Sequence, residues 1–314
     1  MDALTGLLDG PRARGAFLLR SVLDPPWALR IQDRAPITLL AVERGEAWIV
    51  PDTGPPTPLR PGDIAVVRGP DPYTVADDPA TEPRIVIHPG ELSTTPDGVE
   101  LCADMTLGVR TWGDGLGGSA VLLSGTYQLD GEVSRLLLAA LPHVLVLPAW
   151  NSPLPGLLAE EIGKDEPGQE VVLDRLLDLL LIAVLRAWFS RPEGRAPAWY
   201  RAQGDPVVGR ALGLLHEAPA RPWTVAALAA ETGVSRAALA RRFTELVGRS
   251  PMAYLTDRRL SIAAELLREP DATVGAVARK VGYGSAFALS AAFKRERGVS
   301  PQEHRAGPVA ADRS

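Results

Sequence analysis

Residues 224–243 read TVAALAAETGVSRAALARRF, the pattern of two short helices separated by a glycine. Thr224 and Ser235 precede the two apolar runs, and both residue types are common helix N-caps. Gly233 stands between the helices, where a tight turn requires a positive φ. Leu239 and Phe243 are four residues apart and therefore share one inward face of the second helix. The spacing predicts a helix-turn-helix over residues 224–247.

The same pattern returns further along the chain, where residues 273–293 read TVGAVARKVGYGSAFALSAAF. Ten positions match, with an offset of 49 residues up to the glycine and 50 after it. Because ten matches are implausible by chance, we interpret the tail as a duplicated unit with a second helix-turn-helix over residues 273–297. A longer helix, opened by Pro251 and stopped at Pro270, would join the two copies. With a further helix opened by Asp205-Pro206, the predicted unit spans residues 205–307.

The second helix of a helix-turn-helix fits the major groove of DNA, so its outward residues can touch bases and phosphates. Arginine can read guanine or hold a phosphate, and alanine can meet a thymine methyl. Serines at helix N-termini are placed to bind phosphate. The alternative is that the outward residues are ordinary solvent-facing residues of a small bundle. The predicted DNA-binding residues are Ser235, Arg236, Ala237, Ala240, Arg241, Ser285, Phe287, Ala288, Ser290, Ala291 and Lys294.

The charge of the chain is divided unevenly. Residues 1–204 hold 17 basic and 27 acidic residues, a net charge of -10, whereas residues 205–307 hold 15 basic and 10 acidic residues, a net charge of +5. A basic unit on an acidic body suits a polyanionic partner, because clustered arginines supply phosphate contacts. The charge pattern therefore agrees with double-stranded DNA as the partner of the tail.

The tail resembles the DNA-binding domain of AraC/XylS-type transcription regulators over about a hundred residues. The resemblance rests on SRAALARRF at 235–243, on GRSP at 248–251 with Tyr254, Arg258 and Arg259, and on GYGS at 282–285 through FKR at 293–295 to GVSP at 298–301. It implies two units that enter adjacent major grooves, a rigid connecting helix, activation of transcription and contact with RNA polymerase. Two positions depart from the family pattern: Ala291 stands where an arginine is common, and His304 where an aromatic is usual.

In the front of the chain, short runs of β-branched residues, or of alternating apolar and polar residues, are separated by turn-forming clusters such as Gly54-Pro55-Pro56. Strands at this spacing indicate an antiparallel sandwich or barrel. The predicted fold class is therefore α+β, with an N-terminal antiparallel β-barrel followed by helices and an all-α C-terminal domain. The predicted strands cover residues 37–42, 46–50, 63–67, 84–87, 107–112 and 120–123.

Two motifs, GEAW at 45–48 and LRPGD at 59–63, resemble the cupin-like sensor domain that many AraC-type regulators carry. The resemblance implies a ligand-sensing domain over residues 1–130. Enzymatic cupins hold a metal with three histidines and a carboxylate, but His88 is the single histidine of this β domain. We therefore expect no metal and no cofactor. A barrel without its metal still encloses an apolar cavity, which suits a small-molecule effector that the sequence does not identify.

Two other functions remain open at this stage. The chain could be a cupin-type enzyme of small molecules with a helical appendage, which bound metal and turnover would reveal. The tail could instead be a protein-interaction module, which binding to a protein but not to DNA would reveal. The missing histidines argue against the enzyme, so we predict a regulator without catalytic residues.

Residues 131–190 change to helical spacing and form a predicted helical region. In the helix predicted over 171–189, the charged residues Asp174, Arg175, Asp178 and Arg186 fall within about 120° of one another, and the rest of the circumference is apolar. Such a helix is either buried or packs against a second subunit, so a homodimer contact is one of two interpretations. Residues 191–204, which contain RPEGRAP, are the predicted interdomain linker.

The remaining features narrow the class of protein. Cys102 is the single cysteine, which excludes a disulfide scaffold and leaves it a candidate redox sensor, although Glu100 and Asp104 beside it would slow its reaction. The glycines at 113, 115 and 118 match G-x-G-x-x-G, but a predicted strand follows, so we interpret them as a hairpin loop. No signal peptide or membrane-spanning run is readable, so we expect a cytoplasmic protein without membrane contact.

Overall fold

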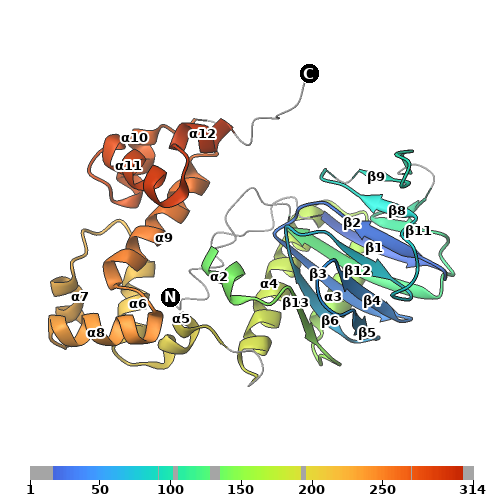
Figure 1. Cartoon of the computed structure of the whole chain (residues 1–314), viewed down its shortest axis with the longest axis horizontal. Coiled ribbons are helices and arrows are strands. Elements are labelled where there is room, and N and C mark those ends of the chain that lie inside the picture. Colours follow the sequence, from blue (N-terminus) through green and yellow to red (C-terminus); the bar gives the residue numbers. More distant parts are fainter. Residues whose placement is uncertain are drawn as a thin grey trace. The chain divides into compact units, whose positions relative to one another are not determined.

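The structure is a computed structural model that describes residues 17–90, 92–101, 105–127, 135–191, 196–269 and 271–306. They form two compact units, which are described separately below (Figure 1). The N-terminal unit lies within residues 12–194 and is rich in strands, and the C-terminal unit, from residue 195 onward, is helical. The predicted α+β class is confirmed. Within the described ranges, no helix has both the length and the apolar character needed to cross a membrane.

Two β-sheets build the N-terminal unit. The larger has the strand order β10-β11-β1-β12-β3-β6-β13 and the smaller β5-β4-β7-β2-β8-β9. Most pairs are antiparallel, and the exceptions are β1 with β11 and β2 with β8. The strands of the larger sheet are β1 (Phe17–Leu23), β3 (Ile37–Arg44), β6 (Ile64–Arg68), β10 (Thr106–Gly108), β11 (Thr111–Gly113), β12 (Ala120–Tyr127) and β13 (Val144–Leu147). Those of the smaller sheet are β2 (Ala28–Ile31), β4 (Ala47–Pro51), β5 (Thr57–Leu59), β7 (Tyr73–Ala76), β8 (Ile85–Ile87) and β9 (Ser93–Thr94).

The predicted closed barrel is corrected to a two-sheet sandwich, because no strand pairing in the described residues joins the two sheets. Edge strands of two or three residues, such as β5, β9 and β10, offer too few backbone groups for pairing across the gap. The strand predicted over 107–112 is wrong as a single element. Arg110 has a φ of 46°, and the chain turns there to form the pair β10 and β11.

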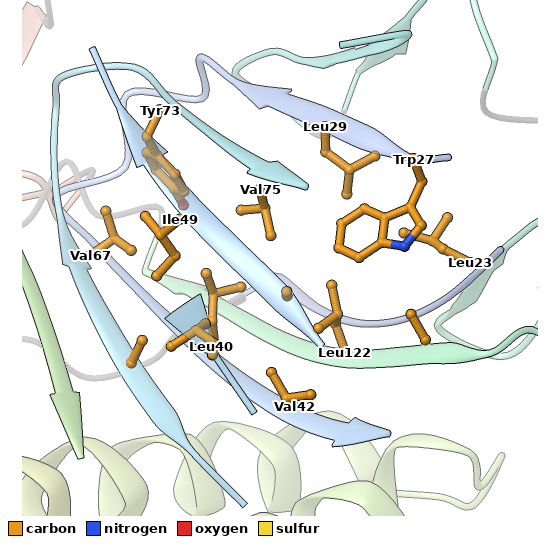
Figure 2. Packing of buried hydrophobic residues seen from close by; sticks show 14 of the residues in the cluster. Leu23, Trp27, Leu29, Leu40, Val42, Ile49, Val67, Tyr73, Val75 and Leu122 are labelled. Atoms are coloured by element: carbon orange, nitrogen blue, oxygen red, sulfur yellow. The ribbon is translucent and has the colours of Figure 1, made fainter. Parts of the chain in front are cut away.

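The hydrophobic core of this unit lies between the sheets, as alternating strand residues require. Figure 2 shows Leu29 and Val75 of the smaller sheet pointing toward Leu40 and Leu122 of the larger one. Trp27 lies in the same layer and is 4% exposed. Burial of these side chains provides the main free energy that holds the two sheets together.

Helix α4 (Gln169–Phe189) packs against the outer face of the larger sheet. Gly125 of β12 makes room for it, since a Cβ there would overlap Leu177 Cδ1. The Tyr127 hydroxyl donates to Asp178 Oδ1 at 3.3 Å, and Arg110 donates to Gln169 Oε1 at 2.6 Å. One apolar face of α4 is therefore covered by the unit's own sheet.

The middle of the chain is less purely helical than predicted. Besides α2 (Arg135–Ala140), α3 (Leu154–Ile162) and α4, it contains strand β13, which pairs with β6. Its VLVL sequence alternates half-buried and buried residues, the period of a strand. This stretch therefore completes the larger sheet and forms one compact unit with it.

The C-terminal unit is a set of helices whose bounds follow the predicted caps and breakers. Asp205 Oδ1 accepts hydrogen bonds from the backbone N–H groups of Val207 and Val208, which explains the Asp-Pro start signal. The predicted linker 191–204 is partly helical and contains α5 (Ala198–Arg201) and the 3₁₀ turn η2 (Ala202–Gly204). The other helices are α6 (Val208–Glu217), α7 (Val225–Thr232), α8 (Arg236–Val247), α9 (Pro251–Leu266), α10 (Val274–Val281), α11 (Ala286–Arg297) and α12 (Pro301–Ala306).

Candidate nucleic-acid interface

The two predicted helix-turn-helix units are α7 with α8 and α10 with α11, and they are built in the same way. Ser235 Oγ accepts from the N–H of Ala238 at 3.2 Å, and Ser285 Oγ accepts from the N–H of Ala288 at 3.1 Å. Thr224 and Thr273 cap the first helix of each unit through the same interaction. The helices α7 and α10 both end at a left-handed glycine, with φ of 70° at Gly233 and 88° at Gly282. The sequence repeat is therefore a repeat of local structure.

The inward faces of α8 and α11 are anchored by matching residues. Leu239 and Phe243 of α8, and Leu289 and Phe293 of α11, have no exposed surface. The Phe243 ring meets Tyr254 of α9 edge-on, with centroids 5.8 Å apart. Such burial fixes the rotation of each helix about its axis, and so decides which residues face outward.

The outward residues are largely the predicted ones. Arg236, Ala237 and Arg241 of α8 are exposed, and Ala240 is half-buried. On α11, Phe287 is 84% exposed, an unusual position for a large apolar side chain. Ser285, Ala288, Ala291 and Lys294 are also exposed, and Ser290 is half-buried. Each unit thus presents one continuous outward face that begins at the serine N-cap.

The arginines of α8 differ in what they contact. Arg241 has only an exposed ion pair with Glu245 in the described structure, 3.7 Å from Nε to Oε1. Such a pair contributes little to stability, so Arg241 can exchange it for another partner. Arg242 instead contacts Asp205 at 2.6 Å, which ties α8 to the start of α6. Both arginines are exposed, but Arg242 is held by a contact between two helices of the unit, whereas Arg241, among the described residues, pairs only with a residue of its own helix.

A contact between the two helix-turn-helix units is not evident from the sequence repeat. Arg259 of α9 donates to the carbonyls of Pro219 and Arg221 at 2.7 and 2.8 Å, and it lies 5.9 Å from the ring centroid of Tyr283. Partial burial lowers the pKa of Arg259. Gly282 packs against the backbone of Ala220 in the same place. This joint holds the turn of the second unit against the loop before the first.

Arg297 and His304 also pack inside the C-terminal unit. Burial lowers the pKa of Arg297 to about 10, and its guanidinium lies 5.6 Å from the ring centroid of Phe293. His304, which stands where the family pattern has an aromatic, contacts Phe293 edge-on at 5.3 Å and the Ala264 carbonyl at 3.2 Å. Arg297 remains charged at neutral pH, since its pKa lies well above 7.

The other candidate residues lie in the N-terminal unit. His88 Nε2 lies 2.9 Å from Thr94 Oγ1. Within the described residues, no group of three or more His, Cys, Asp or Glu is placed to hold a metal. The glycine-rich loop leads from β11 to β12, but it is not a hairpin, because β1 lies between these strands. Cys102 lies outside the described residues.

Comparison with known proteins covers both units. A family model described as Cupin matches residues 2–190, and one described as Helix-turn-helix domain matches residues 228–307. A putative AraC-like transcription regulator of Streptomyces lividans is 32% identical over 98% of this chain and 99% of its own length. The HTH-type transcriptional regulator AlkR of Acinetobacter baylyi is 26% identical over 97% of this chain and 99% of its own length.

Among solved structures, the DNA-binding domain of AdpA in complex with a target DNA is 34% identical. It matches 33% of this chain and 92% of that domain, with a TM-score of 0.31. The Cupin model covers more than half of the chain, and the Streptomyces relative matches it from end to end. The chain therefore belongs to the AraC-like transcription regulators, with a cupin domain in its first part and a DNA-binding helix-turn-helix domain in its last.

Proposed function

We propose that the chain is a cytoplasmic, sequence-specific activator of transcription and not an enzyme, and that it reads DNA through the outward faces of α8 and α11. The observation that carries this proposal is the duplication itself. Two units with the same caps, the same turn glycine and the same buried anchors present serine, arginine, alanine and phenylalanine outward. A small effector bound by the cupin domain would shift the population of chains competent for DNA, and RNA polymerase would be the further partner.

The experiment that tests this proposal is a fluorescence-anisotropy titration of labelled DNA from upstream of the protein's own gene. Scrambled DNA serves as competitor, and several salt concentrations are used. We expect a specificity ratio of about 10³ or more and a steep loss of affinity with salt, because phosphate contacts release counterions. Absence of binding to any DNA, with and without candidate effectors, would refute the proposal that the chain is a sequence-specific DNA-binding regulator.

Arg241 is the first residue to test. Arg241→Ala should weaken binding to the specific DNA by about 1–3 kcal/mol and relax the preference at one base pair if the side chain reads a base. A uniform loss over all sequences would instead identify a phosphate contact. The matched control is Arg60→Ala, because Arg60 is likewise 76% exposed and paired with a glutamate, but belongs to the cupin domain. Equal binding by wild type and Arg241→Ala would remove Arg241 from the proposed interface.

We also propose that the chain is a homodimer through α4. Its sheet-facing side is covered, yet Val171, Val172 and Leu179 are 61%, 45% and 49% exposed. Val172, Leu176, Leu179 and Ala183 recur at intervals of three and four residues, so they form one stripe on the helix. A second copy of the same stripe would bury it in a symmetric contact.

The dimer is tested by placing a charge in this stripe. Leu179→Arg should raise the dimer dissociation constant by about tenfold or more, because it buries an unpaired charge in an apolar contact. Sedimentation velocity over a range of protein concentrations measures this change. Leu157→Arg on α3 is the control, since Leu157 is 48% exposed and not on α4. A wild-type chain that stays monomeric at high concentration would disprove the α4 dimer.

A further inference from the structure

A cavity of about 280 Å³ lies between the two sheets of the cupin domain. Strands of both sheets line it, from β1, β3 and β12 on one side to β2 and β7 on the other. Thr106 at its rim is exposed, whereas Leu122 is buried, so the cavity runs from the surface into the core. Pockets for drug-sized ligands measure about 300–1,000 Å³. This one therefore fits a smaller molecule, such as a single ring with a short chain.

Most of the cavity wall is apolar. Leu29 and Val75 of the smaller sheet face Leu40 and Leu122 of the larger one across the space between the sheets (Figure 2). Trp112 of β11 adds an aromatic wall and is 7% exposed. Apolar groups of a ligand would leave water on entering this part, which favours binding in proportion to the area buried.

Four polar residues of the cavity, Asp33, Thr38, Tyr73 and Thr126, lie near the point where β2 leads into β3. Thr38 of β3 is the register partner of Thr126 of β12, so the two hydroxyls stand side by side on the inner face of the sheet. The Tyr73 hydroxyl is hydrogen-bonded to Thr38, and burial raises the pKa of Tyr73. Asp33 is close enough to Tyr73 to raise that pKa further. One carboxyl and three hydroxyls therefore form a polar end of the cavity, and the other polar residues that line it, Ser21, Ser93, Thr106 and Ser124, carry no charge.

Asp33 is the single charged residue that lines this cavity among the described residues. Its Oδ1 accepts a hydrogen bond from the backbone N–H of Ala35 at 3.0 Å. Burial raises the pKa of Asp33, and the hydrogen bond from the backbone N–H of Ala35 opposes that effect only in part. A carboxylate in a partly dehydrated position is favoured by a positive partner, and among the described residues no Lys, Arg or His lines this cavity.

We propose that the cavity binds a small organic amine, with its ammonium group at Asp33 and Tyr73 and its apolar body against Leu40, Trp112 and Leu122. This inference rests on the effector-sensing role proposed above and gives that effector a chemical class. The ammonium donates to the Asp33 carboxylate and to the Tyr73 and Thr126 oxygens, and three donors match these three acceptors. A carboxylic acid of the same shape would place two negative charges together at the polar end.

Isothermal titration calorimetry on the full chain tests the proposal with three probes of one shape and different charge. These are phenethylamine, 2-phenylethanol and phenylacetate. Phenethylamine should bind about tenfold or more tightly than the alcohol, and phenylacetate least, because a charge-assisted hydrogen bond is stronger than a neutral one. In Asp33→Asn the preference for the amine over the alcohol should disappear. Asparagine retains an oxygen for the Ala35 N–H, so this variant is expected to fold.

The control variant is Asp165→Asn, which removes an exposed carboxylate from the loop before α4 and should leave all three affinities unchanged. Three results would overturn the proposal: no binding of the amine at millimolar concentration, equal affinity for amine and acid, or an unchanged preference in Asp33→Asn. The DNA titration of the wild-type chain without probes tests the regulator separately. A chain that binds specific DNA but shows no amine preference would contradict the ligand class and leave the regulator intact.

Discussion

Phe293→Ala should lower the local free energy of unfolding of the second helix-turn-helix by about 3–5 kcal/mol, the range for removing a fully buried phenylalanine. Phe293 has no exposed surface and lies at the centre of a cluster formed by α9, α10 and α11. His304 and Arg297 also contact its ring, at 5.3 and 5.6 Å. Truncation leaves a cavity that these neighbours fill only in part. Amide hydrogen exchange of α10 and α11 in the full chain measures the change.

The matched control is Phe287→Ala on the same helix. Phe287 is 84% exposed, so its removal should change the unfolding free energy by less than about 0.5 kcal/mol. The same variant should weaken binding to specific DNA, because Phe287 stands on the proposed interface. Equal loss of protection in both variants would contradict the assigned rotation of α11. Unchanged DNA binding in Phe287→Ala would remove this residue from the interface.

The sequence predicts the helix-turn-helix units well because their determinants are local. A capping hydroxyl bonds to a backbone N–H three residues on, and the turn glycine acts through its own φ. Ser235, Gly233 and Phe243 therefore reveal the helix bounds and the inward face without knowledge of the rest of the chain. The placement of these residues agrees with the prediction, and their contact with DNA remains a proposal.

The fold of the cupin domain is harder to predict from the sequence because its strand pairings are long-range. Strand β13 pairs with β6 although nearly eighty residues separate them, and β1 lies between β11 and β12. Short runs such as VLVL at 144–147 fit a strand or a helix equally well until their partner is known. The polar end of the cavity also depends on long-range contacts, since Asp33 comes from a loop and Tyr73 and Thr126 from two different sheets, so that only the packing of the sheets brings them to one cavity.

The role of Arg259 is also difficult to predict from the sequence. The motif that carries the family resemblance contains it, but basic residues of a DNA-binding domain are easily taken for DNA contacts. In the structure its guanidinium binds two carbonyls of the loop before α7 and approaches Tyr283. It therefore connects the two helix-turn-helix units, and Gly282 lies at the same contact. This contact joins the two helix-turn-helix units, and under the proposed function it would help to hold α8 and α11 in position on one DNA duplex.

Gly282→Ala should destabilise the second unit by about 2–5 kcal/mol. A left-handed φ of 88° strains any residue with a Cβ by about 1–2 kcal/mol. The new Cβ would also stand 2.5 Å from the carbonyl oxygen and 2.8 Å from the Cα of Ala220, and overpacking adds about 1–3 kcal/mol. Because these neighbours are backbone atoms, relief requires the joint to open. Amide exchange of α10 and α11 measures the destabilisation.

The duplication supplies the control for this variant. Gly233 holds the same position in the first unit with a φ of 70°, but a Cβ there meets nothing within 4 Å. Gly233→Ala should therefore show the backbone strain alone, about 1–2 kcal/mol, and retain the spacing of the two units. Gly282→Ala should in addition weaken DNA binding. The loss should be larger for DNA long enough to contact both helix-turn-helix units than for DNA that only one unit contacts. Equal destabilisation by the two substitutions, with equal DNA binding, would mean that the Gly282–Ala220 contact does not set the arrangement of the recognition helices.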